Sequence, residues 1–159
     1  MVAFDIGLIY IDRLLQATGG PGILSFEFVR NEERAAQFMG EWGAHGRDLA
    51  RLSLWVDFGF MLSYGAFFTL AALATRDFAR SRGLRSLAAV GIVAPFCAAI
   101  AAMFDAGENV NLLLVLGGHG GSVSPALATV CASIKFVLIT IAILYVLWGL
   151  ASRLLRRAG

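Results

Sequence analysis

Three long apolar runs constrain the fold of this chain more than any other feature of its sequence. They lie at about residues 52–74, 87–116 and 125–155, and each is as long as the ~20 residues with which an α-helix crosses a bilayer. Charged residues make up 15% of the 159 residues and hydrophobic residues 58%, whereas soluble domains carry roughly 25% charged residues. We therefore predict an integral membrane protein in contact with a lipid bilayer. The basic residues cluster at helix ends and do not indicate binding to nucleic acid.

A fourth, shorter apolar stretch begins the sequence. Residues 2–15 are apolar except for Asp5, Asp12 and Arg13, and a stretch of ~14 residues is shorter than a span requires. It has neither a basic n-region nor a small-residue cleavage site, which argues against a signal peptide. Three interpretations stay open: a short first span, an interfacial helix, or the tail of a span whose beginning lies upstream of the chosen start. We favour a spanning or half-spanning helix over about residues 2–17.

The segment that follows mixes apolar and charged side chains. Gly19-Gly20-Pro21-Gly22 breaks the first helix. Asn31 is placed to cap a helix that starts at the next residue, and Trp42 suits the headgroup level of a membrane. We expect an outer interfacial helix over about residues 23–42 and a loop at residues 43–46.

The predicted fold class is all-α, an integral membrane helical bundle. We expect four helices plus the outer interfacial helix, all within a single transmembrane domain over residues 1–159. The helices are predicted at about residues 2–17, 48–75, 87–116 and 125–155, the first of them short or partial. Pro95 is expected to kink the third helix.

Charge at the helix ends predicts the orientation. The connection between the second and third helices lies on the same side of the membrane as the C-terminus, because two helices cross between them. Together these segments hold seven arginines and one acid, and short basic segments favour the cytoplasmic side. We expect a multi-pass protein of the inner (plasma) membrane with a cytoplasmic C-terminus. The connection at residues 117–124 then faces outward.

Ionisable residues inside the apolar helices predict a shared polar cluster. Asp57 lies early in the second helix, Asp105 and Glu108 lie late in the third, and Lys135 lies ten residues after the start of the fourth. At a rise of ~1.5 Å per residue, the predicted topology brings all four to a similar depth in the outer half of the membrane. Ionisable groups at such depth are rare and mark functional or paired sites.

Two neutral polar residues join this cluster by helical spacing. Asn109 shares a face with Asp105 and Glu108, and Tyr64 shares a face with Asp57. One lysine and three acids cannot all stay charged in lipid.

We expect Lys135 to pair with either Asp105 or Glu108. Asp57 is expected to be protonated, hydrogen-bonded to Tyr64 or Asn109, or exposed to a water-filled cavity. The cluster has two main interpretations: polar contacts that hold the helices in register, or a functional site. A misplaced membrane boundary is a third.

Metal and cofactor chemistry find little support in the sequence. His45 and His119 lie on the predicted outer side, where they and the carboxylates of the cluster could ligate zinc or iron. Both lie in glycine-rich loops without H-x-x-H or E-x-x-H spacing, so they are weak candidates. We predict no metal and no cofactor. Cys97 and Cys131 lie inside apolar runs and are expected to pack between helices.

Several short motifs occur in an order that resembles a known set of proteins. They are S-F-E-F at 25–28, W-G at 42–43, W-V-D-F-G-F at 55–60, D-A-G-E-N at 105–109 and K-F at 135–136. This order resembles small bacterial four-helix membrane proteins with a D-x-x-E-N helix and a late membrane Lys-Phe. The resemblance covers most of the chain after Pro21 and implies a shared fold and polar cluster, without an assigned activity. In those proteins the first helix is a full apolar span, whereas here it is short and charged.

Three hypotheses for the function follow. The first is a membrane protein that binds a lipid head group or a small polar ligand at the polar cluster. The second is a structural or accessory subunit of a larger membrane complex, in which the cluster holds the helices together. The third is an intramembrane enzyme that uses Asp105 or Glu108 as a general acid or base. The sequence leaves open whether the protein is an enzyme.

Overall fold

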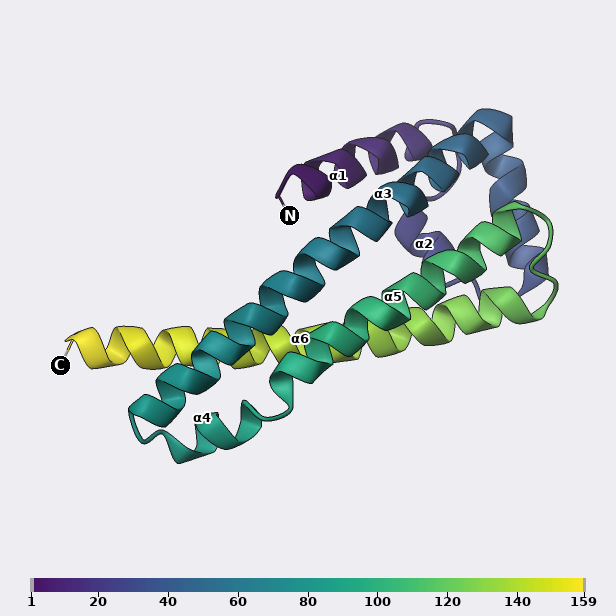
Figure 1. The fold of residues 1–159 in the computed structure, drawn as a ribbon. Coiled ribbons are helices and arrows are strands. Elements are labelled where there is room, and N and C mark those ends of the chain that lie inside the picture. Colours follow the sequence, from purple (N-terminus) through teal and green to yellow (C-terminus); the bar gives the residue numbers. More distant parts are fainter. Residues whose placement is uncertain (1, 159) are drawn as a thin grey trace.

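The computed structural model describes residues 2–158, with side chains described through Arg156. Within that range the chain is helical and contains no strand, which confirms the predicted all-α bundle. In chain order the helices are α1 (Val2–Gln16), α2 (Ile23–Glu27), α3 (Glu32–Ser81), α4 (Arg85–Val90), α5 (Ala94–Leu116) and α6 (Val123–Ala158). Figure 1 shows α3, α5 and α6 as the long members of the bundle.

Three stretches are long and apolar enough to cross a membrane. They lie within Glu32–Ser81, Arg85–Leu116 and Val123–Arg156. The outward faces carry exposed apolar side chains such as Leu62 and Met103, which are 68% and 72% exposed. Such continuous apolar exposure indicates contact with lipid, and these observations support a membrane protein. The 15 residues of α1 are too few for a span by the same criterion, so α1 is a partial fourth helix.

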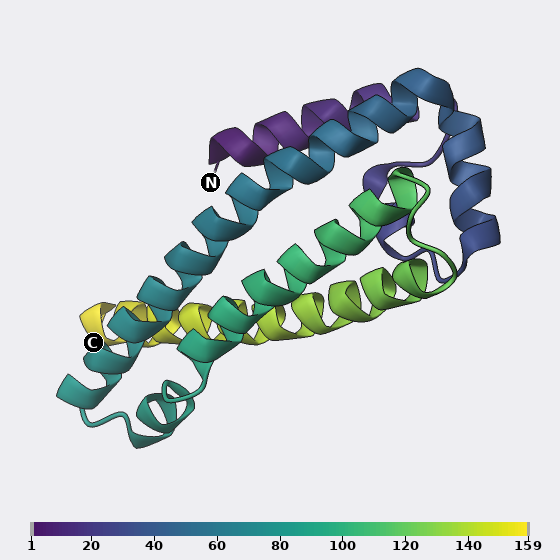
Figure 2. The ribbon, with the colours of Figure 1, turned by 45° about the vertical axis from the view of Figure 1, so that its right-hand side comes forward.

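α5 is the central helix of the bundle. It packs against both α3 and α6, and Figure 2 shows it running between them. α1 lies beside the part of α3 that contains Gly59, and both views place it along the same stretch of that helix. The ring of Phe4 on α1 occupies the space that a side chain at Gly59 of α3 would fill. Small residues allow this close approach between helices in a membrane.

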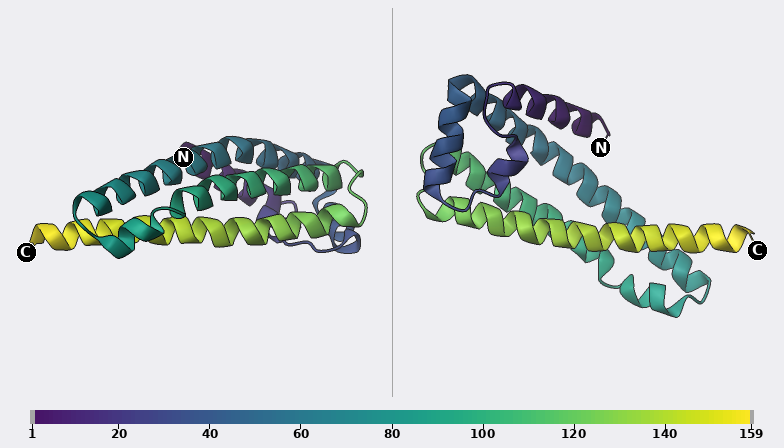
Figure 3. Two further views of the ribbon diagram at one scale, coloured as in Figure 1. Left: turned by 60° about the horizontal axis from the view of Figure 1, so that its bottom comes forward. Right: turned by 180° about the vertical axis from the view of Figure 1, so that it is seen from behind.

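The structure does not contain the single interfacial helix predicted over residues 23–42. Residues 23–42 form the short helix α2, a break, and the beginning of α3. Asn31 caps α3 as expected, because its Oδ1 accepts a hydrogen bond from the Arg34 amide at 2.9 Å. Figure 3 shows this first part of α3 closing one end of the bundle.

Residues 43–46 form a kink in α3 where a loop was predicted. Gly43 has φ 63° and ψ −165° inside a helix that otherwise continues from Glu32 to Ser81. Only glycine adopts this backbone region without marked strain. The kink turns the beginning of α3 across the end of the bundle, while the rest of α3 forms the span.

The third predicted helix is interrupted. α4 ends at Val90 and α5 begins at Ala94, so Gly91–Val93 form a turn within the predicted range 87–116. Pro95 lies in the first turn of α5 and does not kink a continuous helix. Proline is well tolerated there, because the amide it lacks would have no partner within the helix. The backbone at Gly91 is close to the Tyr145 hydroxyl and Arg76, and a side chain at this position would collide with both.

The end of the bundle near Gly43 has its own apolar core. Phe26 of α2 and Trp42 of α3 are buried there with residues from α1, α5 and α6. Their rings meet edge to face at a centroid distance of 4.9 Å, and Trp42 Nε1 donates a hydrogen bond to the Pro21 carbonyl at 2.7 Å. This packing fixes the path of residues 17–31 and thereby the position of α2.

Candidate functional site

Lys135 of α6 is the centre of a buried ion-pair cluster. Its Nζ lies 2.9 Å from Asp105 Oδ1 and 2.7 Å from Glu108 Oε2, both on α5. Glu27 of α2 contributes a third carboxylate, with Oε2 at 3.6 Å from the same nitrogen. The Lys135 side chain is 9% exposed, that of Asp105 3%, and that of Glu108 is fully buried.

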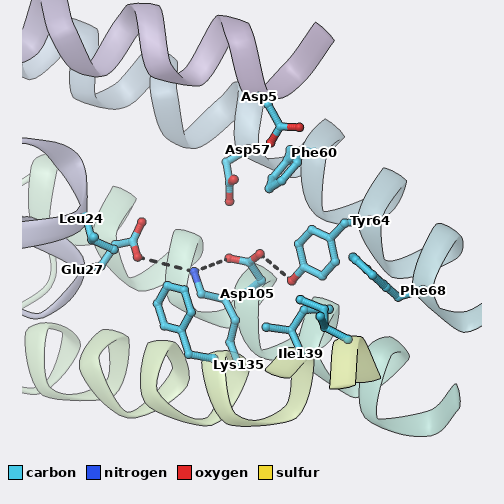
Figure 4. Close-up of a pocket in the computed structure, with 12 residues that line it drawn as sticks. Asp5, Leu24, Glu27, Asp57, Phe60, Tyr64, Phe68, Asp105, Lys135 and Ile139 are labelled. Atoms are coloured by element: carbon cyan, nitrogen blue, oxygen red, sulfur yellow. Dashed lines mark hydrogen bonds and ion pairs between the residues drawn. The ribbon is translucent and has the colours of Figure 1, made fainter. Parts of the chain in front are cut away.

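Two further hydrogen bonds join α3 to this cluster. The Tyr64 hydroxyl donates to Asp105 Oδ2 at 2.7 Å, and Asn109 Nδ2 donates to Asp57 Oδ2 at 2.7 Å. Asp105 therefore accepts a hydrogen bond on each oxygen, one from Tyr64 and one from Lys135 (Figure 4).

The structure brings together all six residues that the sequence placed in the cluster. Asp105, Glu108 and Asn109 lie on one face of α5 because they are spaced by three and four residues. The prediction that Lys135 pairs with one of two acids differs from the structure, in which it contacts both. Asp57 accepts its hydrogen bond from Asn109, whereas the Tyr64 hydroxyl donates to Asp105 and not to Asp57.

Glu27 is a member of the cluster that the sequence reasoning missed. It lies within the predicted interfacial helix at residues 23–42, yet its side chain is only 15% exposed. Thr129 of α6 holds this part of the chain, because its Oγ1 lies 3.3 Å from the Glu27 carbonyl oxygen and 3.1 Å from that of Val29. The one signal in the sequence was its place among large apolar residues in Ser25-Phe26-Glu27-Phe28.

Burial raises the pKa of Glu27 above its ordinary value of 4.5, and the nearby Lys135 ammonium opposes that shift. No hydrogen-bond donor within residues 2–158 reaches Glu27 Oε2, which is buried. Its contact with Lys135 is the longest of the three ion pairs. Glu27 is therefore the carboxylate of the cluster that Lys135 holds most weakly.

A cavity of about 320 Å³ lies beside the ion-pair cluster. One part of its wall is polar, with the side chains of Glu27, Asp57, Tyr64, Asp105 and Lys135.

The rest of the cavity wall is apolar. It consists of Leu24, Phe60, Phe68, Phe136, Ile139 and Ile143. Leu24 is 56% exposed and Phe136 is 40% exposed, so the cavity opens at the surface of the bundle. A pocket that combines an apolar wall with a few convergent polar groups is typical of a small-molecule site.

Asp5 of α1 also lines this cavity. Asp5 is one of the charged residues of the short first helix, and the sequence predicts no role for it in a site. Figure 4 shows it on α1, on the same side of the cavity as Asp57. No cationic partner within 4.0 Å is found for Asp5 or Asp57 among the described residues.

The two histidines are not among the buried residues of the cluster. His45 and His119 are both exposed. Among residues 2–158, no group of three or more histidine, cysteine, aspartate and glutamate side chains has the arrangement of a metal site.

Comparison of the chain with protein families, with curated proteins and with solved structures found no match. The interpretation of the site therefore rests on its own geometry.

Proposed function

We propose that this protein is a membrane-embedded binding protein whose lateral cavity holds a lipid head group or a small polar ligand. The observation that carries the proposal is the cavity itself, which has charged and hydrogen-bonding groups on one part of its wall and apolar side chains on the rest. A ligand with a polar end and an apolar end would satisfy both parts. The cavity volume of about 320 Å³ lies at the lower end of the range for ligand pockets.

The setting that fits this proposal is the inner (plasma) membrane. The arginines at positions 76, 80, 82, 85, 153 and 156 belong to one end of the bundle, formed by the end of α3, α4 and the end of α6. Short basic segments favour the cytoplasmic side, so we propose a cytoplasmic C-terminus. Arg157 is the seventh arginine of this basic group in the sequence, and its side chain lies outside the described residues. We further propose that the chain forms one transmembrane domain.

Photolabelling tests the cavity directly. Three 12-carbon probes that carry the same chain diazirine, and an amine, a hydroxyl or a carboxylate at the end, are added to the protein in phosphatidylcholine nanodiscs. We expect at least one probe to label residues that line the cavity, with saturation and with competition by its unlabelled analogue. The proposal fails if none of the three labels the cavity above the level of other lipid-facing residues.

A matched pair of variants makes this test specific. Ile139→Trp fills part of the cavity wall without changing any charged residue, and should abolish saturable labelling. Ile141→Trp adds the same bulk at a residue of α6 that is 42% exposed and does not line the cavity, and should leave labelling unchanged. Equal labelling in both variants would place the probe outside the cavity.

A structural role in a larger membrane complex is the second candidate. It is favoured by the ion pairs, which join α2, α5 and α6 through Lys135 without any ligand. In that case the cluster stabilises the bundle and the cavity has no specific occupant. A catalytic role for Asp105 or Glu108 has less support, because Lys135 contacts both acids and Tyr64 also engages Asp105.

A further inference from the structure

We propose that the ligand of this cavity is an amphiphile with a positively charged amine at its polar end. This inference rests on the proposed function and specifies the chemistry of the ligand. It follows from three features of the cavity: the balance of charge on its wall, the pairing of Lys135 with carboxylates of the chain, and the aromatic side chains beside the acids.

The charge on the cavity wall is predominantly acidic. Four carboxyl side chains line it, those of Asp5, Glu27, Asp57 and Asp105, against the single ammonium of Lys135 among the described residues. Uncompensated charge is costly at membrane depth. A cationic ligand group would supply the compensation that the chain itself lacks.

Lys135 is not available to bind an anion. Lys135 already has three carboxylates within 4.0 Å and donates a hydrogen bond to Asp105, so its charge is compensated by the chain. A phosphate or carboxylate head group would have to displace one of them and would then face the remaining acids. This arrangement disfavours anionic lipids and fatty acids as ligands.

Two of the acids that line the cavity, Asp57 and Glu27, offer hydrogen-bond acceptors. Asp57 receives a hydrogen bond from Asn109 on Oδ2, and none to Oδ1 is found among the described residues. Glu27 Oε2 likewise receives no hydrogen bond within residues 2–158. A primary ammonium donates hydrogen bonds and carries the complementary charge, and charge-assisted hydrogen bonds are stronger than neutral ones. A hydroxyl would supply a donor without the charge.

Aromatic rings provide an independent reason to expect a cation. Phe60, Tyr64 and Phe68 lie four residues apart on α3, so they share one face, and all three line the cavity. Aromatic faces attract ammonium groups, more so where water is excluded. The cavity already contains one such contact, since Lys135 Nζ lies 4.9 Å from the centre of the Phe136 ring.

The apolar part of the cavity wall would contact the apolar part of the ligand. Phe68 lies one turn beyond Tyr64 on α3, and Ile139 and Ile143 lie one and two turns beyond Lys135 on α6, so they extend the apolar wall past these polar residues. These side chains come from spans whose outer faces contact lipid, so an alkyl chain that leaves the cavity would enter the bilayer. We therefore infer a single-chain amine, or the amine end of a larger lipid, which enters from the membrane.

The three photoprobes distinguish this inference from the proposed function. In the wild-type protein we expect the amine to reach half-maximal labelling of cavity residues at a concentration about tenfold below that of the alcohol, a difference of ~1.4 kcal/mol. The carboxylate should label the cavity least. Better or equal labelling by the alcohol or the carboxylate would overturn the amine inference and leave the binding function intact. Failure of all three would overturn both.

Charge-removing variants identify the acids responsible. Asp57→Asn keeps the size of the side chain and should bring amine labelling to the level of the alcohol. Asp5→Asn, on a different helix, allows the same labelling test at another acid of the cavity if Asp57→Asn does not fold. Asp48→Asn is the matched control, because Asp48 is exposed and pairs with Arg51 outside the cavity. An amine preference that survives in Asp5→Asn and Asp57→Asn would contradict the inference.

Discussion

At the scale of single residues, Lys135 determines the electrostatics of the buried cluster. One ammonium contacts three carboxylates from two helices, with side chains that are nearly or fully buried. Removing one partner of a buried ion pair leaves an uncompensated buried charge, whereas replacing all partners by neutral groups leaves no buried charge at all. This asymmetry allows the contribution of the cluster to stability to be separated from its contribution to binding.

The first prediction concerns the removal of that charge. Lys135→Met should lower the free energy of unfolding by roughly 3 kcal/mol, because it leaves buried acids without their cation. The triple variant Asp105→Asn, Glu108→Gln, Lys135→Met should be more stable than the single variant. Both are measured by reversible unfolding in mixed micelles.

The same triple variant separates binding from structure. If it folds normally and retains the full amine preference in the labelling experiment, the charges of the cluster serve the bundle alone. If the single variant is as stable as the wild type, Lys135 does not compensate the acids as the geometry indicates.

The second prediction concerns pH and Glu27, which lies outside the spanning segments. Burial raises the pKa of Glu27 above 4.5, so the folded state binds this proton more tightly than the unfolded state does. The contribution of Glu27 to stability therefore falls as pH rises from about 4.5 through its folded-state pKa. Glu27→Gln cannot ionise and lacks this loss.

Unfolding of the wild type and Glu27→Gln is compared at a series of pH values from about 4.5 upward. We expect the difference in unfolding free energy to shift in favour of the variant as pH rises. Glu33→Gln, at an exposed position of α3, controls for the loss of a surface charge. A pH-independent difference would contradict the raised pKa.

At the scale of elements, the kink in α3 and the short helix α2 form one end of the bundle. Gly43 turns the chain, Trp42 packs on Phe26, and this packing sets the path that carries Glu27 to Lys135. The site therefore depends on a segment of α3 that does not itself contact the cluster.

The third prediction tests this element. Gly43→Ala places a side chain at φ 63° and ψ −165°, a region that costs non-glycine residues about 1–3 kcal/mol. We expect a loss of thermal stability of that order, measured by circular dichroism, with weaker amine labelling as α2 is displaced.

Gly40→Ala is the matched control for this prediction. Gly40 lies three residues earlier in α3, at a position where an added Cβ meets no atom within 4 Å. Alanine is favoured over glycine within a helix by roughly 0.5–1 kcal/mol, so this variant should be slightly more stable than the wild type. Equal destabilisation by both variants would show that the kink is not the cause.

At the scale of the whole molecule, the bundle has a basic end and an end closed by α2 and the first part of α3. The fourth prediction follows from that asymmetry. A fluorescent protein fused at the C-terminus should fluoresce in the cytoplasm, and alkaline phosphatase fused there should be inactive. Alkaline phosphatase inserted in the Gly117–Ser122 connection should be active. The reverse pattern would invert the proposed orientation.

Much of the fold could be predicted from the sequence, because lipid contact demands long apolar runs. The spans and the positions of their ionisable residues follow from hydropathy alone. The kink at Gly43 and the turn at Gly91–Val93 could not be predicted, since glycine occurs in helices, loops and kinks alike. Which of these forms depends on packing between distant parts of the chain, such as Trp42 against Phe26 beside the kink and Tyr145 against Gly91 at the turn.

The sequence by itself determined that Asp57, Asp105, Glu108 and Lys135 meet at one depth, because helical rise and alternating topology leave little freedom along the membrane normal. Only the tertiary structure decided which groups touch: that Lys135 contacts both acids of α5, and that Glu27 enters from α2. Contacts across helices depend on the rotation and crossing of each helix, and these are fixed by side-chain packing at sites far from the cluster.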